Sequence, residues 1–342
     1  MKPSVTIVFT LLFFVVLGAY LYLGAPRPAK HAKEITPVSN IPEEAIKKSS
    51  SMQLLPIAED DEITAIQIQN LEKKENVTLK RENEGWKISY PVEYPADSLI
   101  VDGLIAALTI SNKARRLVPE QDWEEYGLEK PELKIGIETK KLDKRLYLYL
   151  GDTTPVGDFV FARWEGENEY FLLSANFKKA FQKSIYSLRM KRVFRLPFAK
   201  MAKMHVRTTT GDFEIAHHDD KWFWMEPIPI LGERVPKEKV DDLFARVQDL
   251  HIKDFLDQEP HSKHELGFSL LGTAITLWVD DQHSEMLYLG NEVPTRDSFY
   301  AMREGEDVYF LVARPNIRAL FELIEALAQE TMQKTKPMAV SS

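Results

Sequence analysis

Two hydrophobic patterns divide the chain. The stretch from Ser4 to Leu23 is apolar almost throughout and carries no charge. From residue 61 onward, apolar and polar residues alternate over short runs, as in segment 64–69, which reads TAIQIQ. Alternation is typical of a half-buried β-strand, because successive side chains point to opposite faces of the sheet. The pattern therefore predicts one apolar helix followed by a body rich in strands.

The apolar stretch 4–23 is long enough to cross a bilayer. A helix of about twenty residues rises about 30 Å, which matches the hydrocarbon thickness of a membrane. A cleaved signal peptide is the alternative, but its apolar region usually has about 7–15 residues. In addition, the small residues Gly24 and Ala25 are followed at once by Pro26, a poor cleavage site. We therefore predict an uncleaved, single-pass signal anchor whose residues 4–23 contact membrane lipid.

Residues 24–60 are predicted to be a tether, because prolines and serines recur there without a hydrophobic period. Arg27, Lys30 and Lys33 follow the span, whereas only Lys2 precedes it, and local charge counting alone would keep the body inside the cell. Long domains, however, are translocated largely regardless of such charges. We therefore expect an extracytoplasmic body.

The body repeats itself at an offset of 139 residues. The segment 148–152 reads LYLGD and returns as LYLGN at 287–291. Apolar positions at helical spacing also recur: Val101, Leu104, Ile105 and Leu108 return as Val240, Leu243, Phe244 and Val247. We therefore predict an α+β fold of two tandem modules, each a mainly antiparallel sheet with packed helices.

The predicted boundaries follow from this repeat. The first α+β module covers residues 61–198 and the second covers residues 199–330. A flexible tail is predicted at 331–342. A helix is also expected after Ser174, carrying Phe177, Phe181 and Ile185.

Four glycines recur with the repeat. Gly151 and Gly290 end apolar strands, and we interpret them as turn positions that tolerate a positive φ angle. Gly166 and Gly305 are predicted to lie in short hairpin loops. No glycine-rich phosphate-binding motif is present, so these glycines indicate folding rather than nucleotide binding.

The composition of the chain excludes several classes of functional site. Hydrophobic residues make up 44% and charged residues 28%, which is ordinary for a globular protein. The absence of cysteine excludes disulfides, thiolate zinc sites, iron–sulfur clusters and cysteine nucleophiles. The net charge is −8, and the excess of acidic residues lies in the body, which argues against a nucleic-acid partner.

Histidines supply the best metal candidates. The run 217–220 reads HHDD, but adjacent strand residues point to opposite faces, so we interpret the run as a polar hairpin turn. His261 and His264 lack an evident third ligand and are expected on a solvated surface. Metalloprotease and serine-hydrolase motifs are absent. We predict no catalytic residue, no metal and no cofactor.

The acidic pairs and the tryptophans could each form a functional site or have only a structural role. The acidic pairs 124–125 and 280–281 are common on an acidic surface, and the second pair fits a turn after a strand. The tryptophans could form a platform for sugars, but large aromatic residues more often pack between sheet and helix. We favour packing for this set: Trp86, Trp123, Trp164, Trp222, Trp224 and Trp278.

Several short segments resemble the bacterial family called domain of unknown function 4340. The segments are GWKI at 85–88, YP at 90–91, PAD at 95–97, YGLEKP at 126–131, LGD at 150–152, PVG at 155–157 and LRMK at 188–191. The resemblance covers roughly residues 62–325, and the first module is the better match. In the second module, GFSL at 267–270 departs from the Gly-Leu-Asp-x-Pro of the family.

The resemblance implies a membrane span, an outward-facing body and genes beside those of gliding-motility-type ABC transporters. It carries no catalytic residues to transfer. The expected function is therefore that of a membrane-tethered, non-enzymatic accessory protein of an ABC-type envelope transport or assembly system, in the bacterial inner membrane. The expected partner is an ABC transporter permease or another envelope protein. The alternative is an extracytoplasmic ligand-binding module or a hydrolase acting on a cell-envelope polymer.

Overall fold

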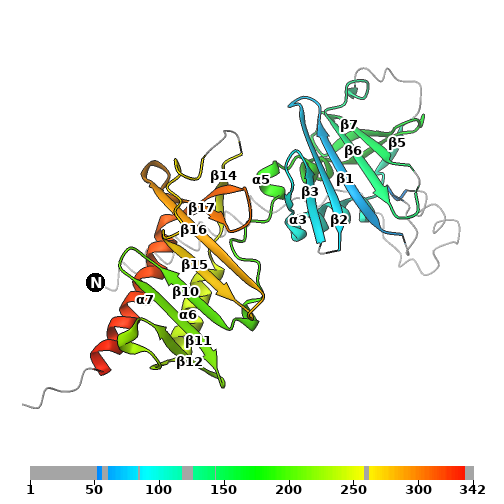
Figure 1. Cartoon of the computed structure of the whole chain (residues 1–342). Helices are drawn as coiled ribbons and strands as arrows, with labels where there is room; N and C mark the ends of the chain where they lie inside the picture. The colour runs from blue at the N-terminus through cyan, green and yellow to red at the C-terminus, as the bar shows by residue number, and fades with distance from the viewer. Residues whose placement is uncertain are drawn as a thin grey trace, which may run out of the picture. The chain divides into compact units, whose positions relative to one another are not determined.

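The computed structural model describes residues 52–55, 61–83, 85–117, 126–142, 144–257 and 262–335. The predicted membrane span at 4–23 and most of the predicted tether lie outside these ranges. Among the helices in the described ranges, none is both long enough and apolar enough to cross a bilayer. The described residues form two α+β modules (Figure 1).

The first module is built on a nine-stranded antiparallel sheet in the order β4-β3-β2-β1-β6-β7-β8-β9-β5. Its elements are β1 (Ile63–Asn70), β2 (Glu75–Glu82), β3 (Gly85–Tyr90), β4 (Tyr94–Pro95), α3 (Ser98–Ile110), β5 (Arg115–Leu117), β6 (Leu133–Thr139), β7 (Leu146–Thr153), β8 (Phe159–Trp164), β9 (Tyr170–Ser174), α4 (Ala175–Phe181) and α5 (Ile185–Leu188).

The second module has a nine-stranded antiparallel sheet in the order β13-β12-β11-β10-β15-β16-β17-β18-β14. Its elements are η2 (Phe198–Lys200), β10 (Lys203–Arg207), β11 (Asp212–His218), β12 (Lys221–Glu226), η3 (Ile228–Ile230), β13 (Arg234–Val235), α6 (Lys237–Gln248), β14 (Ile252–Phe255), β15 (Ala274–Trp278), β16 (Ser284–Val293), η4 (Pro294–Arg296), β17 (Ser298–Arg303), β18 (Tyr309–Ala313) and α7 (Arg314–Thr335).

The two strand orders are the same when each strand of the first sheet is matched to its repeat. The central pair is β1 with β6 in the first sheet and β10 with β15 in the second. Both sheets also end in their shortest strands, β4 and β5 in one and β13 and β14 in the other. The structure confirms the predicted α+β fold of two tandem modules with mainly antiparallel sheets.

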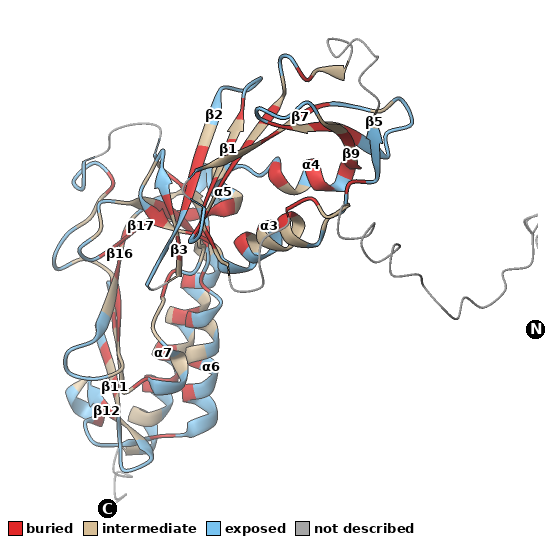
Figure 2. Ribbon diagram, turned by 90° about the vertical axis from the view of Figure 1, so that its right-hand side faces the viewer, coloured by how far each residue is buried: buried red, intermediate tan, exposed pale blue. Residues whose placement is uncertain are grey.

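Helices cover one face of each sheet. The buried positions of α3 are Val101, Leu104 and Leu108, and those of α6 are Val240, Leu243 and Val247. They face the core between helix and sheet, with α4 beside α3 and α7 beside α6 (Figure 2). The opposite face of each sheet has no helix packed on it among the described residues, so it carries the half-exposed side chains of the strands.

The helix after Ser174 is shorter than predicted. Ser174 does cap it, since its side chain accepts a hydrogen bond from the Asn176 amide. However, α4 ends at Phe181 and the separate helix α5 begins at Ile185. The break arises because Ser184 caps α5 by accepting from the Ser187 amide.

The interpretation of Gly151 and Gly290 as turn residues is wrong. Both lie inside strands, β7 and β16, and neither has a positive φ angle. A Cβ atom on either would lie 2.2 Å from a carbonyl oxygen, that of Tyr126 or of Leu266. Glycine is therefore needed so that another backbone segment can touch the strand. Gly166 and Gly305 do have positive φ angles and lie between paired strands, as predicted.

Parts of the predicted tether and tail are ordered in the structure. Leu54 and Leu55 are fully buried in the core of the first module, and the Leu54 amide donates to the Ser111 carbonyl at 2.9 Å. At the other end, α7 continues to Thr335. Both extensions arise from apolar residues that cover the ends of a core.

Tyr94 links the two modules. It lies in β4 of the first sheet, but its ring is part of the core cluster of the second module and is 3% exposed. Arg303 Nη2 donates to the Tyr94 hydroxyl at 2.6 Å. Nearby, the buried Arg189 forms an ion pair with Asp257 at 2.5 Å.

Candidate functional site

The exposed face of the first sheet carries a cluster of aromatic and charged residues on β6, β7 and β8. The strand register sets Lys134 opposite Tyr149, and Tyr149 opposite Arg163. Tyr147 lies on the same face as Tyr149, because residues two apart in a strand share a face. We call Lys134, Tyr147, Tyr149, Arg163 and Glu165 the tyrosine cluster.

The side chains of the tyrosine cluster hold one another in place. Lys134 Nζ lies 3.9 Å from the centroid of the Tyr147 ring and 5.1 Å from that of Tyr149. It also donates to Glu165 Oε1 at 3.1 Å. The guanidinium of Arg163 lies over the Tyr149 ring at 4.7 Å, and the Tyr149 hydroxyl donates to Glu165. Stacked cations and a shared carboxylate make this surface pre-organised.

A glycine makes room for the Tyr147 ring. Gly136 pairs with Tyr147 across the sheet, and a Cβ at this position would lie 2.9 Å from both the Tyr147 ring and Arg145 Cδ. Without a Cβ, the ring can lie across the strand. The sequence therefore provides the local geometry of the tyrosine cluster as well as its side chains.

The pKa values of Lys134, Tyr149 and Glu165 are each shifted away from neutrality. The hydrogen bond from Tyr149 and the nearby Lys134 lower the pKa of Glu165. Burial and the hydrogen bond to Glu165 raise the pKa of Tyr149. Burial acts to lower the pKa of Lys134, but its hydrogen bonds to Glu165 and Tyr149 outweigh burial and the pKa is raised. A general acid or base needs a pKa near the working pH, so these groups suit fixed-charge recognition better than proton transfer.

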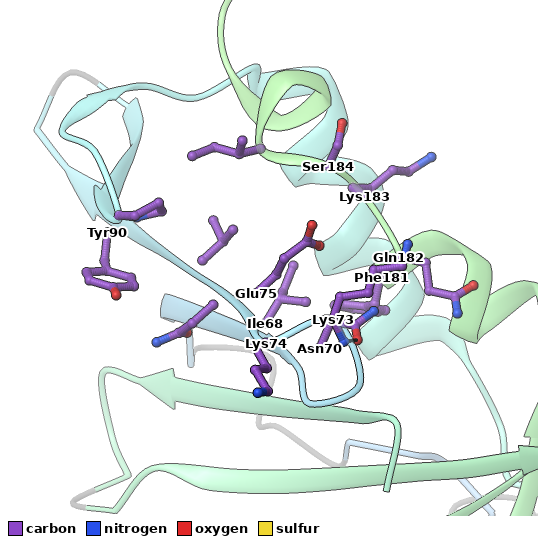
Figure 3. Close-up of a pocket in the computed structure, with 14 residues that line it drawn as sticks. Ile68, Asn70, Lys73, Lys74, Glu75, Tyr90, Phe181, Gln182, Lys183 and Ser184 are labelled. Atoms are coloured by element: carbon purple, nitrogen blue, oxygen red, sulfur yellow. Dashed lines mark hydrogen bonds between the residues drawn. The ribbon is translucent and has the colours of Figure 1, made fainter. Parts of the chain in front are cut away.

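A pocket of about 430 Å³ opens elsewhere in the first module, between the β1–β2 turn and the segment joining α4 to α5 (Figure 3). Its apolar lining includes Ile68, Val77 and Phe181, all of them buried. Three exposed lysines surround it, Lys73, Lys74 and Lys183, and one exposed carboxylate, that of Glu75, also lines it. We call it the lysine-rimmed pocket. Its chemistry suits a ligand that has an apolar body and a negative charge.

A comparison with protein families matches residues 86–269 to the family described as Domain of unknown function (DUF4340). The match covers more than half of the 342 residues. The chain belongs to the DUF4340 family. No curated protein and no solved structure gave a match.

The DUF4340 match begins in β3 and ends before β15, so it includes the tyrosine cluster and reaches into the second module. The predicted resemblance to this family is therefore confirmed. The membrane span and the gene neighbourhood that the resemblance implies stay predictions.

In this DUF4340 chain, the HHDD run is a hairpin turn, as predicted. His217 and His218 end β11, and Asp219 and Asp220 adopt positive φ angles before β12 begins at Lys221. The His217 ring packs on Trp222 with centroids 5.1 Å apart. His264 is exposed, and His261 lies outside the described residues. The structure brings none of these described histidines together as a set of ligands.

The structure instead groups His205, Asp212 and Glu226, whose ligand atoms lie within 4.8 Å of one another. They come from β10, β11 and β12, so sequence spacing alone gave no signal. Asp212 Oδ1 already accepts from Arg207 Nε at 3.0 Å and lies 3.1 Å from His205 Nε2. The guanidinium would repel a cation there, so we interpret the group as an ion-pair network.

Four of the five described tryptophans pack against a core or a helix, as the sequence favoured. The fifth, Trp278, is half-exposed, and Lys203 Nζ lies 4.1 Å from the centroid of its ring. Trp86, Trp164 and Trp224 are buried, and Trp222 contacts Phe244 of α6 with ring centroids 5.3 Å apart. Buried rings cannot form a platform for sugars. Trp123 lies outside the described residues.

The acidic pair 280–281 lies between β15 and β16, and Asp280 accepts from the amides of Gln282 and His283. The pair therefore forms a turn, as predicted. The pair 124–125 lies outside the described residues.

Proposed function

We propose that this DUF4340 protein is a membrane-tethered, extracytoplasmic, non-enzymatic accessory protein that binds a protein of the cell envelope through the tyrosine cluster. The observation that carries the proposal is the pre-organised surface of Tyr147, Tyr149, Lys134 and Arg163. Tyrosine and arginine are enriched at the energetic centres of protein interfaces. Rings that are already ordered lose little conformational freedom on binding, which favours affinity.

The partner proposed is a subunit of an ABC-type transport or assembly system in the inner membrane. What supports a membrane partner is the uncharged stretch 4–23, which would hold the body near the bilayer. Tethering would raise the effective concentration of the body beside a membrane-embedded partner, so a modest interface would suffice.

Topology is tested first. A full-length chain fused at its C-terminus to alkaline phosphatase should be active, and the same chain fused to green fluorescent protein and exported in the unfolded state should be dark. The opposite pair of results would place the body in the cytoplasm and contradict the proposal.

Site-specific photo-crosslinking tests the binding surface. Phe159 lies on β8 on the same face as Arg163 and is 37% exposed, so benzoylphenylalanine can replace it conservatively. Leu99 is 84% exposed on α3, which packs on the opposite face, and serves as the matched control site. We expect an adduct with an ABC-type permease from position 159 and none from position 99. Equal crosslinking from both positions would rule out a specific interface on the exposed face of the first sheet.

The lysine-rimmed pocket favours a second candidate, an extracytoplasmic ligand-binding module. This candidate predicts that native mass spectrometry of the membrane-purified protein finds a bound anionic amphiphile, and that Lys73→Glu with Lys183→Glu removes it. A ligand retained by the double variant would contradict this second candidate.

A further inference from the structure

The outer face of the second sheet repeats part of the tyrosine cluster. Tyr288 and Glu304 occupy the positions of Tyr149 and Glu165, at the repeat offset of 139 residues. The Tyr288 hydroxyl lies 3.4 Å from Glu304 Oε1, so the tyrosine–carboxylate pair is present in both modules.

The cations of the first module have no counterparts in the second. Ala274 pairs with Tyr288 where Lys134 pairs with Tyr149. Met302 likewise pairs with Tyr288 where Arg163 pairs with Tyr149. The two positions that place positive charge over the tyrosine in the first module are thus small or apolar in the second.

A pocket of about 280 Å³ occurs at this place in the second module. We call it the second-module pocket. Its lining combines the Tyr288–Glu304 pair with the apolar side chains of Phe268, Leu270 and Met302. The other lining residues are Lys263, Ser269 and Gly305. The stacking of Phe268 on Tyr309, with ring centroids 5.8 Å apart, fixes one wall.

The carboxylate of the second-module pocket forms no ion pair with Lys263, the lysine that lines the pocket. Glu304 forms no ion pair within 4 Å among the described residues, whereas Glu165 pairs with Lys134. Two basic residues of this module contact other groups instead: Lys263 Nζ lies 4.0 Å from Asp307, and Arg207 donates to Asp212 and to the Leu270 carbonyl. An ammonium group entering the pocket would therefore find an available acceptor beside an aromatic ring.

We propose that the second-module pocket binds a lysine side chain of a partner protein. Its ammonium group takes the position that Lys134 Nζ holds in the first module, donating to Glu304 beside the Tyr288 ring. Its methylene stem lies against Met302 and Phe268. The first module thus provides, within the same chain, the geometry of the bound state.

A protein is favoured as the source of the lysine because the pocket mouth is apolar. Leu270 and Leu271 are 82% and 85% exposed, and Leu270 also lines the pocket. Two adjacent exposed leucines would bury apolar area against a protein surface but not against a free amine. This site lies on the other sheet from the tyrosine cluster, so it does not rest on the function proposed above.

The experiment uses the full chain in detergent, labelled at its methionine methyl groups. The Met302 signal is assigned with a Met302→Leu variant and followed during titration with Nα-acetyl-lysine N-methylamide. The matched ligand is Nα-acetyl-norleucine N-methylamide, which keeps the stem but lacks the charge. Met225 is 42% exposed and does not line the pocket, so its signal is the internal control.

We expect a saturable shift of Met302 with the lysine ligand and about tenfold weaker binding of the norleucine ligand, because a hydrogen bond between charged groups is lost. Equal binding of both ligands would show a merely apolar pocket and overturn the proposal. An unchanged Met302 signal with the lysine ligand would also overturn it.

Two variants identify the groups involved. Glu304→Gln should weaken the lysine ligand about tenfold, whereas Glu238→Gln, at an exposed position on α6 outside the pocket, should leave its affinity unchanged. Ala274→Lys should abolish binding by supplying the cation from within. If Ala274→Lys fails to fold, the comparison of the two glutamine variants decides alone. Equal affinities in those two variants would contradict the assignment of Glu304.

Discussion

Glycine at two equivalent strand positions lets a neighbouring backbone touch each sheet. At Gly290, the adjacent Asn291 amide donates to the Leu266 carbonyl at 2.8 Å. A methyl group at Gly290 would meet that same oxygen, so Gly290→Ala should destabilise the protein by about 1–3 kcal/mol in urea unfolding. Gly103→Ala is the matched control. It lies in α3 with open space around it and should stabilise by about 0.5–1 kcal/mol. An unchanged free energy of unfolding in Gly290→Ala would show that the backbone segment at Leu266 can move away from the strand.

Glu165 gives a prediction about pH. Its pKa is lowered from the ordinary 4.5 by the Tyr149 hydroxyl and by Lys134. A lowered pKa means that the folded state favours the ionised form, so this stabilisation is present at neutral pH and is lost as the pH falls below 4.5. Glu165→Gln should therefore be less stable than the natural protein at pH 7, and the difference should shrink towards pH 3. A difference independent of pH would mean that the charge of Glu165 has no role.

Part of the tyrosine cluster could be predicted from sequence. Leu148 and Leu150 alternate with Tyr147 and Tyr149, and that alternation places both tyrosines on the exposed face. The partnership with Lys134 could not be predicted, because it depends on the register between β6 and β7. The group of His205, Asp212 and Glu226 could not be predicted either, because it depends on the register between β10, β11 and β12.

The helices α3 and α6 are the elements that the sequence specified best. Their apolar spacing predicted Leu104 and Leu243 as core positions, and these side chains are 1% and 0% exposed. Leu104→Ala and Leu243→Ala should each cost about 2–5 kcal/mol, because truncation leaves a cavity in a packed core. Urea unfolding of the full chain measures this. Leu99→Ala in the exposed part of α3 should stay within about 0.5 kcal/mol. Similar effects for all three would mean that the helices are not packed.

Element boundaries were less predictable than element types. The apolar positions Phe177, Phe181 and Ile185 fit one helical face, so the sequence favoured a single helix. The structure ends α4 at Phe181 because Ser184, a good N-cap residue, begins α5 instead. The preference of Ser184 for an N-cap position thus had a larger effect than the helical spacing of the apolar residues.

At the scale of the whole molecule, Tyr94 should couple the stability of the two modules. The residue belongs to the first sheet but fills the core of the second module. Tyr94→Ala should therefore destabilise the second module. We expect faster hydrogen exchange of the amides in β10 and β15. Tyr90→Ala is the control, because Tyr90 is 53% exposed. Faster exchange confined to the first sheet would contradict this coupling. This link could not be predicted from the sequence, because the repeat predicts each module separately.

The short strands at the edges of both sheets have a consequence for folding. A chain that carries two sheets of the same strand order risks pairing a strand of one with the edge of the other before either is complete. β4 and β13 have two residues each, and β5 and β14 have three and four, so an edge offers few free backbone groups to a wrong strand. Pro95 removes one more donor from the β4 edge. Each module therefore completes its own sheet, and the short edge strands disfavour pairing of a strand from one module with the sheet of the other.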